Sequence, residues 1–100
     1  MREVPYPTPG EILLHEFMEP MGLTKYRLAK EIGVAQGRIG SIITGKRAIT
    51  ADTGLRLSRF FETSEGFWSG FQLDYGSAQA KGLLTEVLDK IQQWSAKHAS

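Results

Sequence analysis

The segment from Lys25 to Thr44 restricts the possible folds of this chain more than any other. Ala29 stands where one helix would press against the next, and Gly33 stands where the chain would turn between them. Apolar residues occupy the positions that such a pair of helices would bury: Leu28, Ile32, Val34, Ile39 and Ile42. A small residue, a glycine and apolar residues seldom meet these fixed offsets by chance. The segment therefore predicts a helix-turn-helix, whose second helix lies in the major groove of DNA.

Positive charge is concentrated around this segment. The whole chain carries +1, but residues 24–59 hold eight lysines and arginines against two acidic residues, a local charge of +6. Residues 1–23 and 60–100 carry −3 and −2. Basic charge alone would indicate only a solvated surface, whereas basic charge over a helix-turn-helix favours phosphate binding. We therefore expect double-stranded DNA as a partner.

Composition limits the class of protein. One hundred residues, 41% of them hydrophobic, can form one core but not a second stable one. The absence of cysteine excludes disulfides and thiolate zinc sites. No apolar run approaches the roughly 20 residues of a membrane helix, and the first ten residues lack a signal-peptide pattern. We expect a soluble, cytoplasmic protein with no membrane contact.

Capping signals predict the first two helices. The sequence Thr8-Pro9-Gly10-Glu11 is a capping box with proline at the first helical position, which favours a helix from there to about Met21. Thr24 is suited to cap a second helix, which Gly33 would end. These two helices would lead directly into the predicted DNA-binding helix.

Further signals predict three more helices. The third should run from about Gln36 to Thr44 and end at Gly45 in the left-handed conformation. Thr50 should cap a fourth helix, and a fifth should extend from a Ser64 cap to Gly76. The fifth helix carries aromatic residues at helical spacing, which predicts a buried face: Phe67, Trp68, Phe71 and Tyr75. Residues 1–77 are therefore expected to form an all-α, five-helix domain.

Residues 78–100 are expected to add a helical extension, as part of the same compact unit or as a dimer interface. Between residues 78 and 98, apolar residues follow at spacings of four and three, which predicts one seam on a helix: Ala80, Leu84, Val87, Ile91 and Trp94. Such a seam needs a partner. It could fold back on the domain, pair with its copy in a dimer, or bind another protein. We expect Leu84, Val87, Ile91 and Trp94 to form a dimer or partner surface.

The helix-turn-helix geometry predicts which residues meet DNA. The base-facing candidates are Gln36, Gly37, Arg38 and Ser41. The phosphate-contacting candidates are Lys25, Arg27, Thr44, Lys46 and Arg47. The Gln36 amide can form two hydrogen bonds with N6 and N7 of adenine, whereas Arg38 could donate two hydrogen bonds to guanine or bind a phosphate. Gly37 and Gly40 each cost the helix about 1 kcal/mol relative to alanine, so packing must hold it and DNA shape should share in specificity.

Catalysis has little support in the sequence. His15 and His98 are the only histidines, they lie far apart, and no carboxylate or cysteine stands at the spacing of a metal or triad site. No glycine-rich phosphate loop follows a strand. We expect neither an enzyme nor a cofactor.

Several motifs together resemble the HigA-type antitoxins, within the lambda-repressor-like, XRE group of helix-turn-helix proteins. The resemblance covers roughly residues 8–75, and its motifs are Pro9-Gly10-Glu11-Ile12-Leu13, Glu19-Pro20-Met21-Gly22-Leu23-Thr24, Arg27-Leu28-Ala29-Lys30, Arg38-Ile39, Gly45-Lys46-Arg47-Ala48-Ile49-Thr50-Ala51-Asp52-Thr53, Leu55-Arg56-Leu57 and Phe67-Trp68. It implies a lambda-repressor-like fold and a bacterial antitoxin that binds a HigB-like toxin, a small RelE-type messenger-RNA endonuclease. It also implies a homodimer that represses its own operon at a palindromic operator, with Gln36, Arg38 and Ser41 in the recognition helix and Lys46 and Arg47 in the loop after it.

Two other functions remain open from the sequence. The chain could be a stand-alone XRE-family regulator without a toxin partner. It could also be a protein-binding module that has lost DNA reading, as the glycines in the third helix would allow.

Overall fold

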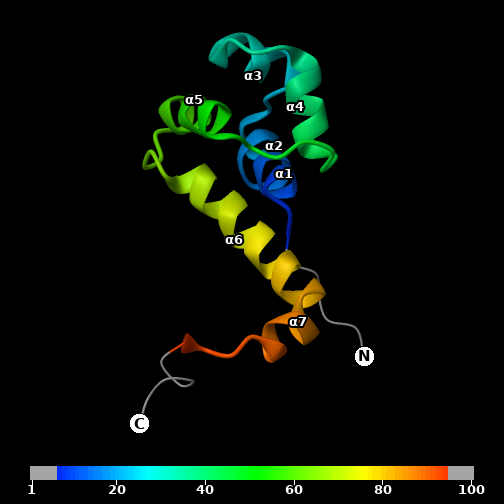
Figure 1. Ribbon diagram of the computed structural model, residues 1–100. Helices are drawn as coiled ribbons and strands as arrows, with labels where there is room; N and C mark the ends of the chain where they lie inside the picture. Colours follow the sequence, from blue (N-terminus) through cyan, green and yellow to red (C-terminus); the bar gives the residue numbers. More distant parts are fainter. Residues whose placement is uncertain (1–6, 95–100) are drawn as a thin grey trace.

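The computed structural model describes residues 7–94, which form helices joined by short loops (Figure 1). In chain order the elements are α1 (Pro9–Ile12), η1 (Leu13–Met18), α2 (Glu19–Met21), α3 (Lys25–Ile32), α4 (Gln36–Ile43), α5 (Ala51–Phe61), α6 (Phe67–Leu83) and α7 (Thr85–Lys90). No strand occurs among the described residues, and the all-α prediction is confirmed.

The first three elements form one helical segment with a wide turn in its middle. The capping box is present: the Thr8 hydroxyl accepts from the Glu11 amide, and the Glu11 carboxylate accepts from the Thr8 amide. In the π-helical part η1, the amide of Glu19 donates to the carbonyl of Leu14, five residues earlier. Pro20 accounts for this wide turn, because it has no N–H and its ring would press on a carbonyl one α-helical turn earlier. The wide turn was not predicted from the sequence.

The predicted helix-turn-helix is formed by α3 and α4. The Thr24 hydroxyl caps α3 by accepting from the Arg27 amide at 3.0 Å. Gly33 adopts the left-handed conformation between the helices at φ +76°, and Gly45 adopts it after α4 at φ +83°. The residues expected to be buried are buried, except Val34, which is partly exposed: Leu28, Ala29, Ile32, Ile39 and Ile42. The ends and the packing of both helices are therefore as predicted.

Gly10 lets the start of α1 touch the backbone of α4. A Cβ atom at this position would overlap the carbonyl oxygen of Ile42 and crowd the Cα of Ile43. Only glycine permits so close an approach. The first helix thereby supports the far end of the predicted recognition helix.

Trp68 lies in an aromatic cluster between η1, α5 and α6. Its side chain is fully buried, and its ring centroid lies 4.9 Å from that of Phe17 and 5.1 Å from that of Phe67. The predicted buried aromatic face is confirmed at Trp68. Phe71 and Tyr75 are only half-buried, and Phe67 lies at the rim with 38% of its surface exposed.

The boundaries predicted for the fifth helix are wrong at both ends. Gly66 is the N-cap of α6, and Ser64 contributes its main-chain carbonyl, which accepts from the Phe67 amide at 3.1 Å. The helix then continues through Gly76 to Leu83. A glycine inside a helix costs only about 1 kcal/mol, and the alanine-containing sequence after Gly76 favours helix over a turn.

The single helix predicted for residues 78–98 is also wrong within the described residues; 95–98 lie outside them. The helix breaks at Leu84, and the backbone at Ile91, after α7, is extended. At the break, the Thr85 hydroxyl donates to the carbonyls of Lys81 and Gly82 at 3.0 and 3.3 Å. Because this hydroxyl occupies carbonyls at the end of α6, it competes with continued helix.

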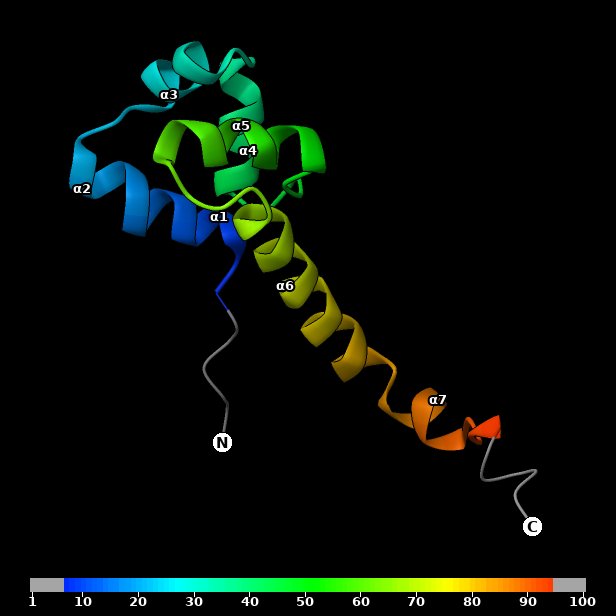
Figure 2. The ribbon, with the colours of Figure 1, turned by 90° about the vertical axis from the view of Figure 1, so that its left-hand side faces the viewer.

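The second half of α6 and α7 form an arm that leaves the helical body (Figures 1 and 2). The molecule is elongated, with principal extents of 60 × 33 × 20 Å. The seam residues on this arm are all exposed: Ala80, Leu84, Val87, Ile91 and Trp94. The described arm does not fold back on the domain, which leaves a second copy or another protein as its partner.

Candidate DNA-binding surface

The outward face of α4 carries two of the four residues predicted to face bases, and a third stands at its edge. Ile39 and Ile42 point into the core, and at about 100° per residue Gly37 and Ser41 lie opposite them, with Gln36 on the flank next to Ile39. Gln36 and Gly37 are exposed, and Ser41 is half-buried. A Cβ at Gly37 would meet no atom within 4 Å, so this glycine leaves open space at the surface. Because Gly37 has no side chain, the helix backbone at this position can approach a duplex closely.

Arg38 lies on a flank of α4, beside α5. Its Nη1 donates to the Thr53 hydroxyl at 3.3 Å and lies 3.8 Å from Oδ1 of Asp52. The side chain is 34% exposed. The structure therefore directs Arg38 toward the start of α5 and away from the outward face of α4.

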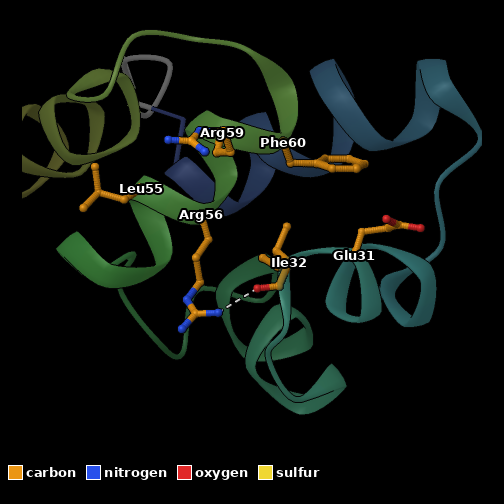
Figure 3. Close-up of a pocket in the computed structure, with 6 residues that line it drawn as sticks. All are labelled: Glu31, Ile32, Leu55, Arg56, Arg59 and Phe60. Carbon is orange, nitrogen blue, oxygen red and sulfur yellow. Dashed lines mark hydrogen bonds between the residues drawn. The ribbon is translucent and has the colours of Figure 1, made fainter.

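Asp52 is shared by two arginines. Its Oδ1 accepts from Nε of Arg56 at 2.7 Å, in addition to its longer contact with Arg38. Nη1 of Arg56 in turn donates to the carbonyls of Ile32 and Gly33 at 2.8 and 3.3 Å (Figure 3). A chain of polar contacts thus runs from the turn of the helix-turn-helix, across α5, to α4.

The predicted phosphate contacts frame α4 on both sides. Lys25 begins α3, and its Cδ would lie 3.9 Å from a Cβ at Gly40, so its stem runs along α4. Lys46 and Arg47 are exposed in the loop after α4. These cations lie at the edges of the outward face, where duplex phosphates would run.

The two remaining phosphate candidates already have partners. Nε of Arg27 donates to the Glu31 carboxylate at 2.7 Å, although the Arg27 side chain is well exposed. The Thr44 hydroxyl donates to the carbonyls of Gly40 and Ser41 at 3.1 and 3.3 Å. Either residue would have to share these contacts with a phosphate.

A hollow of about 350 Å³ lies between α4, the loop after it and α5. Arg38 and Arg47 enter it from different elements, and the other lining residues are Ala48, Thr50, Asp52 and Thr53. Two arginines therefore line one hollow at the edge of the α4 surface. The sequence predicted a phosphate role for Arg47, but the spacing alone could not show that Arg38 meets it there.

A groove of about 550 Å³ between α3 and α5 was not predicted from the sequence (Figure 3). Its lining residues are Glu31, Ile32, Leu55, Arg56, Arg59 and Phe60. Leu55 is half exposed and stands outside the buried face of α5, which was the available signal. The groove is distinct from the outward face of α4.

Metal and membrane features are not found in residues 7–94. No cluster of histidine, cysteine or acidic residues there could hold a metal ion. No helix there has the length and apolar character to cross a membrane. Nδ1 of His15 donates to the Glu19 carboxylate at 3.0 Å, and this contact raises the pKa of His15 above 6.5.

Known proteins share the helix-turn-helix of this chain. A family model described as helix-turn-helix matches residues 14–68. The chain belongs to this helix-turn-helix family. Virulence-associated protein I of Dichelobacter nodosus is 43% identical to this chain over 79 residues. The aligned part is 79% of this chain and 73% of that protein.

Two solved structures of similar proteins show the same fold. One is the Pseudomonas aeruginosa antitoxin HigA with the higBA promoter, at a TM-score of 0.83 and 31% identity, covering 88% of this chain and 97% of that one. The other is an addiction module antidote protein of a HigA family from Coxiella burnetii, at a TM-score of 0.83 and 32% identity, covering 91% of this chain and 100% of that one. Relatives at this level support the lambda-repressor-like, all-α fold of this HigA-like protein.

Proposed function

We propose that this chain is a HigA-like antitoxin of the bacterial cytoplasm that represses its own toxin–antitoxin operon by sequence-specific DNA binding. The observation that carries the proposal is the outward face of α4, with Gln36 and Ser41 free to meet base edges and Lys25, Lys46 and Arg47 at its margins. The similar P. aeruginosa antitoxin, whose structure was solved with the higBA promoter, supports the same use of this surface.

We further propose that the chain acts as a homodimer on a palindromic operator. A single helix-turn-helix offers a small interface, whereas two copies about 34 Å apart contact successive turns of one face of the duplex. The exposed arm supplies the apolar surface for pairing, through Leu84, Val87, Ile91 and Trp94. Its described charged residues are of both signs, so two arms would not repel strongly: Asp74, Lys81, Glu86, Asp89 and Lys90.

The toxin partner is part of the same proposal. A HigB-like, RelE-type messenger-RNA endonuclease would be bound and neutralised by this antitoxin. No catalytic role is assigned to the antitoxin itself. Co-expression with the small protein encoded next to it tests this part: a stable complex that blocks RNA cleavage is expected, and an unlinked neighbourhood with no such complex favours the stand-alone regulator instead.

DNA binding is tested with duplex from the chain's own promoter. If two protomers neutralise about eight phosphates, the logarithm of affinity should fall with the logarithm of salt concentration at a slope of about −7. A scrambled duplex of equal length is the control, and the promoter should bind at least about 1,000-fold more tightly. A slope of zero on both duplexes would refute the proposal and favour a module that has lost DNA reading.

A further inference from the structure

Arg38 stands apart from the other residues predicted to face bases. Ser41 lies on the outward side of α4 and Gln36 is exposed on the flank next to Ile39, whereas Arg38 is partly buried on the other flank, beside Ile42. The direction of the guanidinium follows from this position. It reaches across to α5, where Nη1 donates to the Thr53 hydroxyl at 3.3 Å.

The groups that hold Arg38 are themselves fixed. Thr53 is almost fully buried, so its hydroxyl has a set position. The Asp52 carboxylate, 3.8 Å from Arg38, is held on its other side by Arg56 at 2.7 Å. Arg56 is anchored in turn by the Ile32 carbonyl at 2.8 Å. Both partners of Arg38 therefore have a fixed place in the fold, Thr53 by burial and Asp52 by its contact with Arg56.

The location of this guanidinium suits a contact with the DNA phosphate backbone better than a contact with a base edge. Base edges lie in front of the outward face of a recognition helix, and the phosphate backbones pass along its flanks. Arg38 and Arg47 line the same hollow at such a flank. Two arginines from different elements that line one hollow suit an anionic phosphodiester, because a guanidinium can offer it paired N–H donors.

We infer that Arg38 contacts the DNA backbone and does not read a base, and that Asp52 is the residue that positions it. Base reading then falls to Gln36 and Ser41. This inference rests on the proposed DNA-binding function and adds a division of roles within the same surface. It assigns to Asp52 a negative charge that aids DNA binding indirectly, through Arg38.

The test compares R38Q with Q36A on a panel of duplexes. The panel contains the promoter site and single base-pair substitutions at each position under α4. Removing one arginine from a phosphate should weaken binding by about fivefold at ~0.15 M salt and reduce the magnitude of the salt slope by about 0.9. R38Q should weaken every duplex equally by this amount per protomer and leave the order of preference unchanged. Q36A should instead lose preference at one base pair by about five- to 150-fold.

The role of Asp52 is tested by a double-mutant cycle. D52N keeps the size of the side chain and removes its charge. If Asp52 positions Arg38, R38Q should cost less than about twofold per protomer in the D52N background, against about fivefold in the wild type. D74N, which removes an acidic charge from α6, is the matched control and should leave the effect of R38Q unchanged. D52S, which also removes the carboxylate, is the second variant should D52N fail to fold, with the same expected loss of the Arg38 effect.

The outcomes separate this inference from the function on which it rests. If R38Q erases preference at one base pair, Arg38 reads that base and the inference is overturned, although the function stands. If R38Q costs as much or more in D52N than in the wild type, Asp52 does not position Arg38 and that role is overturned. If the wild type shows no salt-dependent DNA binding, the proposed function itself fails.

Discussion

Arg56, in the middle of α5, donates from Nη1 to the main-chain carbonyl of Ile32 at 2.8 Å. The last carbonyls of a helix have no partner within that helix, and Ile32 is the last residue of α3. The Arg56 side chain of α5 therefore satisfies a main-chain carbonyl at the end of the first helix of the helix-turn-helix. This contact links the stability of the motif to the packing of α5.

Replacing Arg56 should destabilise the fold more than replacing its neighbour Arg59. Arg56→Gln removes a charged hydrogen bond to a main-chain carbonyl, and we expect a loss of about 1–2 kcal/mol in the free energy of unfolding, measured with urea. Arg59→Gln is the matched control, because Arg59 lines the same groove without a hydrogen bond to another described residue. Equal losses for the two variants would contradict a stabilising role for the contact.

Two glycine-to-alanine substitutions should act in opposite directions. Gly10→Ala forces a Cβ onto the Ile42 carbonyl and should cost about 1–3 kcal/mol. Gly37→Ala meets open space on α4 and should stabilise the protein by about 1 kcal/mol. Thermal unfolding of both variants measures the difference.

Stabilisation by Gly10→Ala would show that α1 and α4 are not packed as described. Unchanged promoter binding by Gly37→Ala would show that the glycine has no role at the DNA surface.

A charge on the arm should abolish the proposed dimer. Ile91 is 62% exposed beyond α7, so Ile91→Asp should leave the fold intact and yield monomers in sedimentation. Leu55→Asp is the control, because Leu55 is a comparably exposed apolar residue in the groove between α3 and α5. A dimer that survives Ile91→Asp but not Leu55→Asp would place the interface in the groove.

The pKa of His15 should lie above the ordinary histidine value. Hydrogen bonding and charge attraction from Glu19 raise the pKa of His15 above 6.5. A raised folded-state pKa stabilises the fold below pH 6.5, and this stabilisation is lost as the pH rises through the folded-state pKa. A histidine NMR titration, assigned with His15→Gln, measures the shift. Glu19→Gln should return the midpoint toward 6.5, and an unshifted wild-type midpoint would refute the pairing.

Local signals in the sequence predicted three capped helix starts correctly, but not the start of α6, where Gly66 and not Ser64 is the N-cap. The caps at Thr8, Thr24 and Thr50 and the turn at Gly33 depend on neighbouring residues alone, and each forms as expected. The same holds for the buried residues of α3 and α4, whose spacing already fixes which side faces inward.

Features that depend on distant contacts could not be predicted in this way. Gly76 was expected to end a helix, but the helix continues to Leu83. The residues next to Gly76 do not by themselves determine whether the chain stays helical after it. The direction of Arg38 depends on Thr53 and Asp52, fifteen and fourteen positions later in the chain, which only the folded helices bring beside it. The α3–α5 groove likewise exists only once Arg56 has joined the two helices.

The unbroken course of α6 has a mechanical consequence. In a dimer joined through α7, the continuous helix α6 of each protomer would form a rigid connection from the helical body as far as the break at Leu84, and it would thereby limit the separation of the two DNA-binding surfaces. Binding of such a dimer should tolerate base changes between the half-sites far better than the insertion of a single base pair. The insertion both increases the distance between the half-sites and rotates one of them away from its recognition helix.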